Sequence, residues 1–447
     1  MIQGRITVKL KVGRVDFFVY SIWILFFIAV LSGYQYANAD PLVIATFFLI
    51  GIMAFCKAVV GNKNITIKRN YYIFCLIFFF FAPLQQYLSG TRLWSGNGMS
   101  VIYTDNDYLT VNVLLLASML FFELGYGFYE RKVRKIKREK KELHEYTTRS
   151  DKASIFLLMA ITVLSAGGII ATKGMSAIIS ESAIVSQIKH MVLFAPVICI
   201  IVCLINIKDG NIKAKKYLIC MVLVTALVFL LYSGAIARFI LLGAVMAVLS
   251  YALLDYKNKS IYFSLYIAGF FFAFSMMRNK NIFEGNLLNF VDFRQADYDA
   301  YQMFILVVRY VRDHGISWGM NLLSAAFCFI PRSIANWRME ATGGIVVSAA
   351  GSWFENVSCP LPAEMYFAFG TVGVIVLSIL LGILVCWIDC KSDDKSHFFR
   401  GLFAILSGVT LYVMRGSLLA TFSFTVGIML AYWAVYNWVY MRAKIRS

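Results

Sequence analysis

The chain has 447 residues, of which 60% are hydrophobic and 15% are charged, and its mean hydropathy is +0.73. Soluble domains are roughly half apolar and a quarter charged, so this composition excludes an ordinary soluble protein. The net charge of +18 does not indicate nucleic-acid binding, because the Lys and Arg residues lie between apolar runs, where they orient membrane helices.

Apolar runs recur along the whole chain. A run of about twenty residues crosses a bilayer core roughly 30 Å thick, so the pattern predicts an all-α polytopic membrane protein. The first run lacks a small-residue cleavage site, and we interpret it as a retained helix. We expect about twelve transmembrane helices, at 17–33, 41–60, 71–89, 108–128, 153–172, 190–207, 217–235, 237–254, 261–277, 364–388, 401–414 and 417–438.

Alternate connections between these spans are basic. The intervening short connections contain almost no Lys or Arg, and this asymmetry predicts that both termini are cytoplasmic. The chain then divides into residues 1–277 with nine spans, a long periplasmic loop at 278–363, and residues 364–447 with three spans and a cytoplasmic tail.

The densest positive segment is Arg131–Lys141, with eight Lys or Arg in eleven residues. It could bind anionic lipid headgroups, but a cytoplasmic stop-transfer segment explains it more simply.

Motifs for cofactors are absent from the sequence. The nine cysteines form no C-x-x-C pair, and Cys328 and Cys359, the two in the long loop, lie 31 residues apart, so we expect neither a disulfide framework nor a metal site. No phosphate-binding loop of the G-x-x-x-x-G-K-[ST] type occurs, and ATP-driven transport is therefore not expected.

Arginines from three distant parts of the chain fall at the same predicted membrane depth. Arg238 begins one span, Arg415 ends another, and Arg332 and Arg338 lie in the long loop. A single arginine at this depth can reach the interface by extending its side chain. Several together favour an anion site, because the planar guanidinium binds phosphate bidentately.

Carboxylates accompany these arginines. Asp299 precedes Tyr301–Val311, where apolar residues at helical spacing predict an amphipathic helix at the interface. Glu364 opens the tenth span, where it either favours the helix dipole or acts as a general base. His314 could also serve as a base, although the following glycine fits a helix-terminating turn better.

An external phosphate site beside carboxylates suits a lipid-pyrophosphate glycosyl donor. The arginines would stabilise the charge that develops on the leaving pyrophosphate. A carboxylate would take the proton from the attacking sugar hydroxyl. Hydrolysable nucleotides are absent outside the membrane, so a preactivated lipid-linked sugar is the natural energy source.

Five sequence segments between about residues 230 and 420 occur in a recognisable order. The pieces P-R-S-I, which includes Pro331, and E-x-Y-x-x-F-G, which includes Tyr366 and Gly370, are the most specific. In this order the segments resemble the Wzy-type O-antigen polymerases, the oligosaccharide repeat unit polymerases of bacterial envelopes. The five segments are Ser233–Arg238, Asp299–Tyr301, Phe329–Ile334, Pro362–Gly373 and Arg415–Gly416.

The chain departs from that family pattern at two places. The family usually continues P-R-S-I with Trp-Pro and a Lys-Pro pair, whereas Ala335–Arg338 stands here. Either Arg338 replaces that lysine or the register differs. An acidic residue often follows R-G in the family, and here Ser417 occupies that position.

The resemblance implies a GT-C-like, inverting, metal-independent glycosyltransferase without a cofactor, in the bacterial inner membrane. It would transfer a growing glycan from undecaprenyl pyrophosphate to a new lipid-linked repeat unit. Its partners would be membrane lipids, an upstream flippase and a chain-length regulator. Glu364 would be the first choice of base and Asp299 the second. The pyrophosphate would bind Arg238, Arg332, Arg338 and Arg415.

Three other functions remain open from the sequence. An O-antigen ligase-like enzyme would use the same donor, but the E-x-Y-x-x-F-G motif argues against it. A lipid-linked oligosaccharide flippase would carry charges along a central cavity, whereas here the ionisable residues gather in one loop and two hairpins. A structural scaffold would leave this clustering of arginines unexplained.

Overall fold

A computed structural model gives the structure of the chain. Within the residues that it describes, every regular element is helical, and nine helices are long and apolar enough to cross a membrane. The chain is therefore a multi-pass membrane protein. The described residues are 39–60, 64–93, 103–139, 152–171, 183–211, 213–232, 238–256, 293–355, 357–392 and 396–445, with Tyr20, Ser21, Trp23, Ile24, Phe27, Ile28, Tyr262 and Tyr266.

Nine of the expected spans correspond to these helices. α9 (Arg238–Ala252), in the expected span 237–254, is a shorter apolar helix. The expected spans 17–33 and 261–277 lie largely outside the described residues, so the total of twelve stays a prediction. The nine long helices are α2 (Pro41–Phe55) continued to Val60, α3 (Ile67–Leu76) continued through Ile77–Phe81 and α4 (Ala82–Leu88), α5 (Asp105–Glu139), α6 (Lys152–Ala171), α7 (Ala183–Lys208), α8 (Ala214–Leu231), α14 (Leu361–Ser392), α15 (His397–Arg415) and α16 (Leu418–Ile445).

Side chains at the helix starts fix where several spans begin. Asp40 precedes Pro41 and accepts the Leu42 N–H at 2.6 Å, so α2 begins with a capping carboxylate and a proline whose missing N–H costs nothing there. At the start of α3, the Asp389 carboxylate of α14 accepts the Ile67 N–H at 2.7 Å. This bond ties the start of α3 to the end of a helix more than 300 residues away in the sequence.

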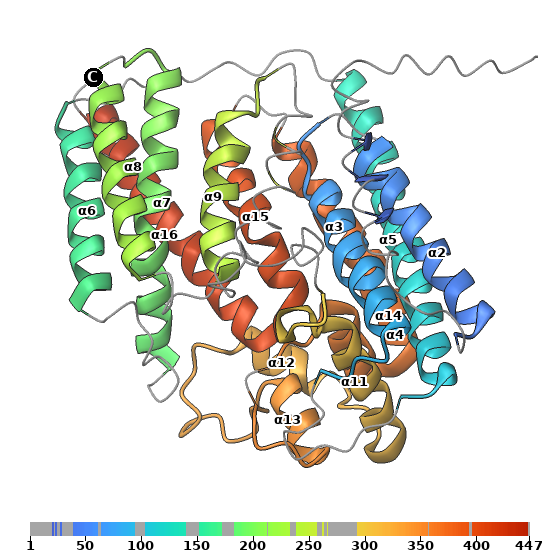
Figure 1. The fold of residues 1–447 in the computed structure, drawn as a ribbon. Helices are drawn as coiled ribbons and strands as arrows, with labels where there is room; N and C mark the ends of the chain where they lie inside the picture. The colour runs from blue at the N-terminus through green and yellow to red at the C-terminus, as the bar shows by residue number, and fades with distance from the viewer. Residues whose placement is uncertain are drawn as a thin grey trace, which may run out of the picture.

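The helices form two packed groups that share α9 and α15 (Figure 1). One apolar core joins α2–α5, α11 and α14, and the other joins α6–α8 and α16. α5 and α14 approach closely at Gly125 and Gly382, where a Cβ atom would collide with the backbone of the other helix. Small residues permit such close contact between membrane helices.

The described part of the long loop contains four helical elements. They are η7 (Ala296–Tyr298), α11 (Ala300–His314), α12 (Met320–Ala326) and α13 (Thr342–Ala349). α11–α13 lie at the end of the bundle opposite the C-terminus, and we call this the loop end (Figure 1). The helix predicted at Tyr301–Val311 is present as α11, whose first half is buried.

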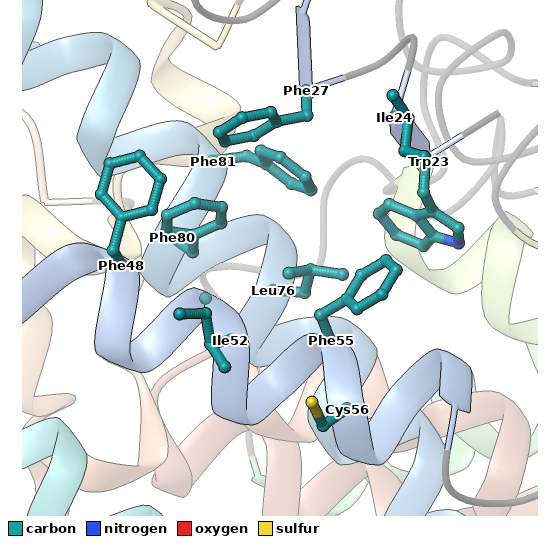
Figure 2. Close-up of a pocket in the computed structure, with 11 residues that line it drawn as sticks. Trp23, Ile24, Phe27, Phe48, Ile52, Phe55, Cys56, Leu76, Phe80 and Phe81 are labelled. Carbon is teal, nitrogen blue, oxygen red and sulfur yellow. The ribbon is translucent and has the colours of Figure 1, made fainter. Parts of the chain in front are cut away.

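Two apolar cavities open among the described helices. The smaller, about 250 Å³, lies between α2, α3 and the described residues near Trp23, and rings such as Phe27, Phe48 and Phe80 surround it (Figure 2). We call it the aromatic cavity. The larger, about 430 Å³, lies beside α14 at Val372 and Val376, next to the loop residue Trp318, and we call it the α14 hollow.

Candidate functional site

Asp299 lies directly before α11, and its carboxylate is buried, with 1% of the residue exposed. It accepts the Ser358 hydroxyl at 2.6 Å and the Ser358 N–H at 3.1 Å. Arg415, the last residue of α15, donates from Nη2 to the same carboxylate at 3.0 Å. The pair therefore joins two segments that lie 116 residues apart in the sequence.

The Arg415 guanidinium makes two further contacts. Its Nε donates to the Asp297 carbonyl at 3.0 Å, and the group stacks over the Phe239 ring at 4.4 Å from the ring centroid. These contacts and the bond to Asp299 hold Arg415 within the protein. The charge that we predicted to bind pyrophosphate is thus neutralised by one of the predicted bases.

Glu364 lies in the first turn of α14, and it too is 1% exposed. Its Oε1 accepts the Ser417 hydroxyl at 3.0 Å and the Leu418 N–H at 2.9 Å, at the start of α16. Its Oε2 accepts the Thr342 hydroxyl at 2.6 Å and the Asn321 amide at 2.8 Å. A carboxylate offers about four lone-pair sites, and these four donors match that number.

Cys359 connects the two carboxylates. Its N–H donates to the Arg415 carbonyl at 3.2 Å, and its thiol hydrogen-bonds Glu364. Burial first, and then the charge of Glu364, raise the pKa of Cys359 well above its usual range, so the thiol stays protonated and donates. Asp299, Ser358, Cys359, Glu364, Arg415 and Ser417, with Asn321 and Thr342, form what we call the carboxylate network.

Charge is unevenly distributed in this network. Glu364 has no ion-pair partner among the described residues, and only hydrogen-bond donors surround it. The start of α16 supplies one of them, the Leu418 N–H, with the positive end of a helix dipole. A substrate hydroxyl could reach Glu364 if it took the place of one of the two hydroxyl donors, Thr342 or Ser417.

Arg332 and Arg338 lie in a separate segment, residues 330–340, which we call the arginine turn. The Arg332 side chain is 53% exposed and pairs with Glu340 at 3.3 Å. Arg338 donates from Nη1 to the Ile330 carbonyl, and its Nε is buried without a partner among the described residues. Burial, and then the charge of Arg332, lower the pKa of Arg338. An anion here would relieve both effects.

The remaining motif residues shape the backbone. Gly370 has φ +61° and ψ −147°, a conformation essentially limited to glycine, and it divides α14 into two helical segments. The expected single span 364–388 is therefore interrupted. The Ser317 N–H donates to the Phe367 carbonyl at 2.9 Å, and the Gly319 N–H donates to the Ala368 carbonyl at 3.2 Å. These bonds cap the helical segment that ends at Gly370.

Pro331 and Tyr366 lie outside the carboxylate network. The Pro331 carbonyl accepts the Ile334 and Ala335 N–H groups, each at 3.0 Å, and so closes the arginine turn. Tyr366 is half-buried and packs its ring against Phe304. Arg238 begins α9, but its side chain lies outside the described residues.

The structure brings together Asp299, Glu364 and Arg415 of the predicted site. Within the described residues, no contact joins Arg415 to Arg332 or Arg338. Sequence reasoning missed Asn321, Thr342, Ser358 and Cys359, and it treated Ser417 as a departure from the family, although Ser417 bonds Glu364 directly. The sequence did contain one signal for Asn321, because it and Ser324 are the polar residues of a short, otherwise apolar helix.

Among the described residues, no group of three or more His, Cys, Asp or Glu side chains could hold a metal ion. No family model, curated protein or solved structure matches the chain.

Proposed function

We propose that this protein is a membrane glycosyltransferase that polymerises lipid-linked oligosaccharide repeat units. The supporting observation is that Asp299, Glu364 and Arg415, from three of the five motif segments, belong to one buried network beneath the loop helices. Buried charges are costly unless they are paired and hydrogen-bonded. A network at the loop end with this many hydrogen bonds can hold reacting groups in fixed positions.

In the proposed reaction, an acceptor sugar hydroxyl replaces the Thr342 or Ser417 hydroxyl on Glu364. Its oxygen bonds to the anomeric carbon of the donor glycan while its proton passes to the Glu364 carboxylate. The bond from that carbon to the lipid pyrophosphate breaks, and the pyrophosphate leaves with the electron pair. Asp299 and Arg415 hold the surrounding backbone.

The arginine turn is the better candidate for the leaving group. Arg332 has only an exposed ion pair with Glu340 and Arg338 Nε has no partner within the described part of the chain, whereas Arg415 bonds the buried Asp299. A charge-assisted hydrogen bond is worth about 1.5–3 kcal/mol, and it gains strength as negative charge develops on the pyrophosphate. Arg238 remains a candidate for the same role.

The test is the envelope glycan of a strain that lacks this chain. We expect single repeat units on lipid A, because the upstream flippase and the ligase still act, and long chains should return when the gene is restored. A gel of the extracted glycan measures both. Complete loss of surface glycan would contradict the proposal and favour a flippase or a ligase.

A further inference from the structure

The polar and apolar side chains of α12 are distributed in the reverse of the usual way. Its polar residues Asn321 and Ser324 are buried, and Asn321 bonds Glu364 inside the protein. Leu323 and, just after the helix, Phe327 are exposed. A short helix surrounded by water normally shows the opposite arrangement, because burial removes apolar surface from water and leaves polar groups in it.

The exposed apolar side chains continue from α12 into the arginine turn. The centroid of the Phe327 ring lies 6.2 Å from that of Phe329 and 5.9 Å from that of Trp337. Ile334, three residues before Trp337, is 77% exposed. Apolar side chains that gather on one exposed segment mark an interaction surface. We call this surface the α12 apolar face, and its residues are Leu323, Phe327, Phe329, Ile334 and Trp337.

The α12 apolar face adjoins a membrane span. α12 packs against α14 and α16, which are both long and apolar enough to cross a bilayer. Cys328, just after α12, hydrogen-bonds Ser423 in the second turn of α16. From Leu418, where that span begins, to Ser423 the helix rises about 7.5 Å at 1.5 Å per residue. The neighbouring Phe422 is exposed, so the apolar surface of α16 and that of α12 lie at the same level.

The surface that precedes α12 in the chain is apolar as well. Trp318 is exposed and lines the α14 hollow together with Val372, an exposed residue of the α14 span. Exposed apolar side chains therefore extend from one span across α12 to the next. Aromatic residues are enriched where proteins meet the membrane interface, and interfacial segments bury their apolar side roughly 5–10 Å into the boundary between headgroups and acyl chains.

We propose that the α12 apolar face is embedded in the bilayer leaflet at the loop end, so that residues 323–337 form an interfacial segment of the bundle. Lipid covers this surface because the surface is continuous with the exposed sides of α14 and α16. Arg332 is exposed two residues before Ile334, and its long side chain can extend to the headgroup phosphates. This inference does not depend on the proposed function, and it sets the depth of the arginine turn in the membrane.

The test is photocrosslinking of the full chain in native membranes and, after purification, in liposomes of phosphatidylethanolamine and phosphatidylglycerol. A benzophenone amino acid replaces Ile334, Trp337 or, as the control, Arg312, which forms an exposed ion pair on α11. Mass spectrometry of the loop peptides identifies the adducts. We expect phospholipid adducts at Ile334 and Trp337 and none at Arg312. Crosslinks to another protein in place of lipid, a crosslinked dimer in liposomes, or as little lipid at Ile334 as at Arg312 would overturn the proposal.

A charge placed in the α12 apolar face gives a second measurement. Ile334→Asp should lower the unfolding temperature in lipid nanodiscs by roughly 2–4 °C, because a carboxylate among lipid chains is costly. Asn336→Asp adds the same charge at an exposed polar residue of the same turn and should leave the unfolding temperature unchanged. In water, an exposed substitution such as Ile334→Asp would be tolerated. Equal unfolding temperatures for the two variants would therefore contradict the proposal.

Discussion

The carboxylate network and the arginine turn both lie in or beneath the long loop, and the same family resemblance pointed to both, yet they differ in how their charges are partnered. Asp299 and Glu364 are each 1% exposed and fully hydrogen-bonded, whereas Arg332 is 53% exposed and the Nε of Arg338 has no partner among the described residues. A motif identifies a charged residue, but its partners decide whether that charge holds the fold or remains able to bind a ligand.

Glu364→Gln should have the largest effect on polymerisation. The new amide group must face either the Leu418 N–H or the Asn321 amide, and neither can accept a hydrogen bond from it in the present arrangement. An unsatisfied buried donor costs about 1–3 kcal/mol, so the unfolding temperature should fall. Loss of the base should also reduce polymerisation roughly 10²–10⁴-fold. Glycan chain length, at matched protein levels, measures the second effect.

A matched control is Glu355→Gln, a loop carboxylate whose one side-chain hydrogen bond within the described residues is an exposed bond from Ser348 at 3.2 Å. It should change neither stability nor chain length, because exposed substitutions usually stay within about 0.5 kcal/mol. Long glycan chains from a folded Glu364→Gln variant would show that Glu364 is structural and not the base.

Asp299→Ala and Arg415→Ala should act chiefly on stability. Removing one partner of a buried pair leaves an uncompensated charge and lowers the free energy of unfolding by about 3–5 kcal/mol. Because Arg415 is partly exposed, we expect a loss at the lower end of that range. The double variant should cost clearly less than the sum of the two single variants, because the pair is coupled. Thermal unfolding of the purified protein in detergent measures all three.

Arg312→Ala is the control for that cycle, since Arg312 pairs with Asp313 on an exposed surface. It should leave the unfolding temperature unchanged. Additive losses for Asp299 and Arg415 would mean that the two side chains contribute separately, against the network described above.

Arg332→Ala and Arg338→Ala should have the smallest effect on folding but a clear effect on activity. Losing one charge-assisted bond to the pyrophosphate should reduce turnover about tenfold, with a normal unfolding temperature. Lysine should restore only part of the activity, because an ammonium group cannot bond bidentately. Rates of repeat-unit transfer in membranes measure this.

Glu340→Gln sharpens the same comparison. It removes the exposed carboxylate beside Arg332, and an exposed ion pair is worth at most about 1 kcal/mol. The variant should therefore bind the lipid pyrophosphate up to about fivefold more tightly. If Arg332→Ala and Arg338→Ala both kept wild-type activity, the arginine turn would not bind the pyrophosphate.

Hydropathy was sufficient for the nine long helices of the described residues, because a bilayer demands long apolar runs wherever it is crossed. It could not locate the interruption at Gly370, since a dihedral angle leaves hydropathy unchanged. The pairing of Asp299 with Arg415 was also beyond the sequence, because it depends on how the end of α15 meets the start of α11. We assigned the two residues separate roles for that reason. Nothing in the sequence indicated that the Ser417 hydroxyl would hydrogen-bond Glu364.

Gly370 has a consequence for membranes of different thickness. A spanning helix adapts to a thicker or thinner bilayer by changing its tilt. In α14 the part that follows Gly370 packs closely against α5 and would tilt together with it, whereas the part that carries Glu364 is held by its bonds to α12, α13 and α16. We therefore expect the position of the Glu364 carboxylate to depend little on the thickness of the surrounding membrane.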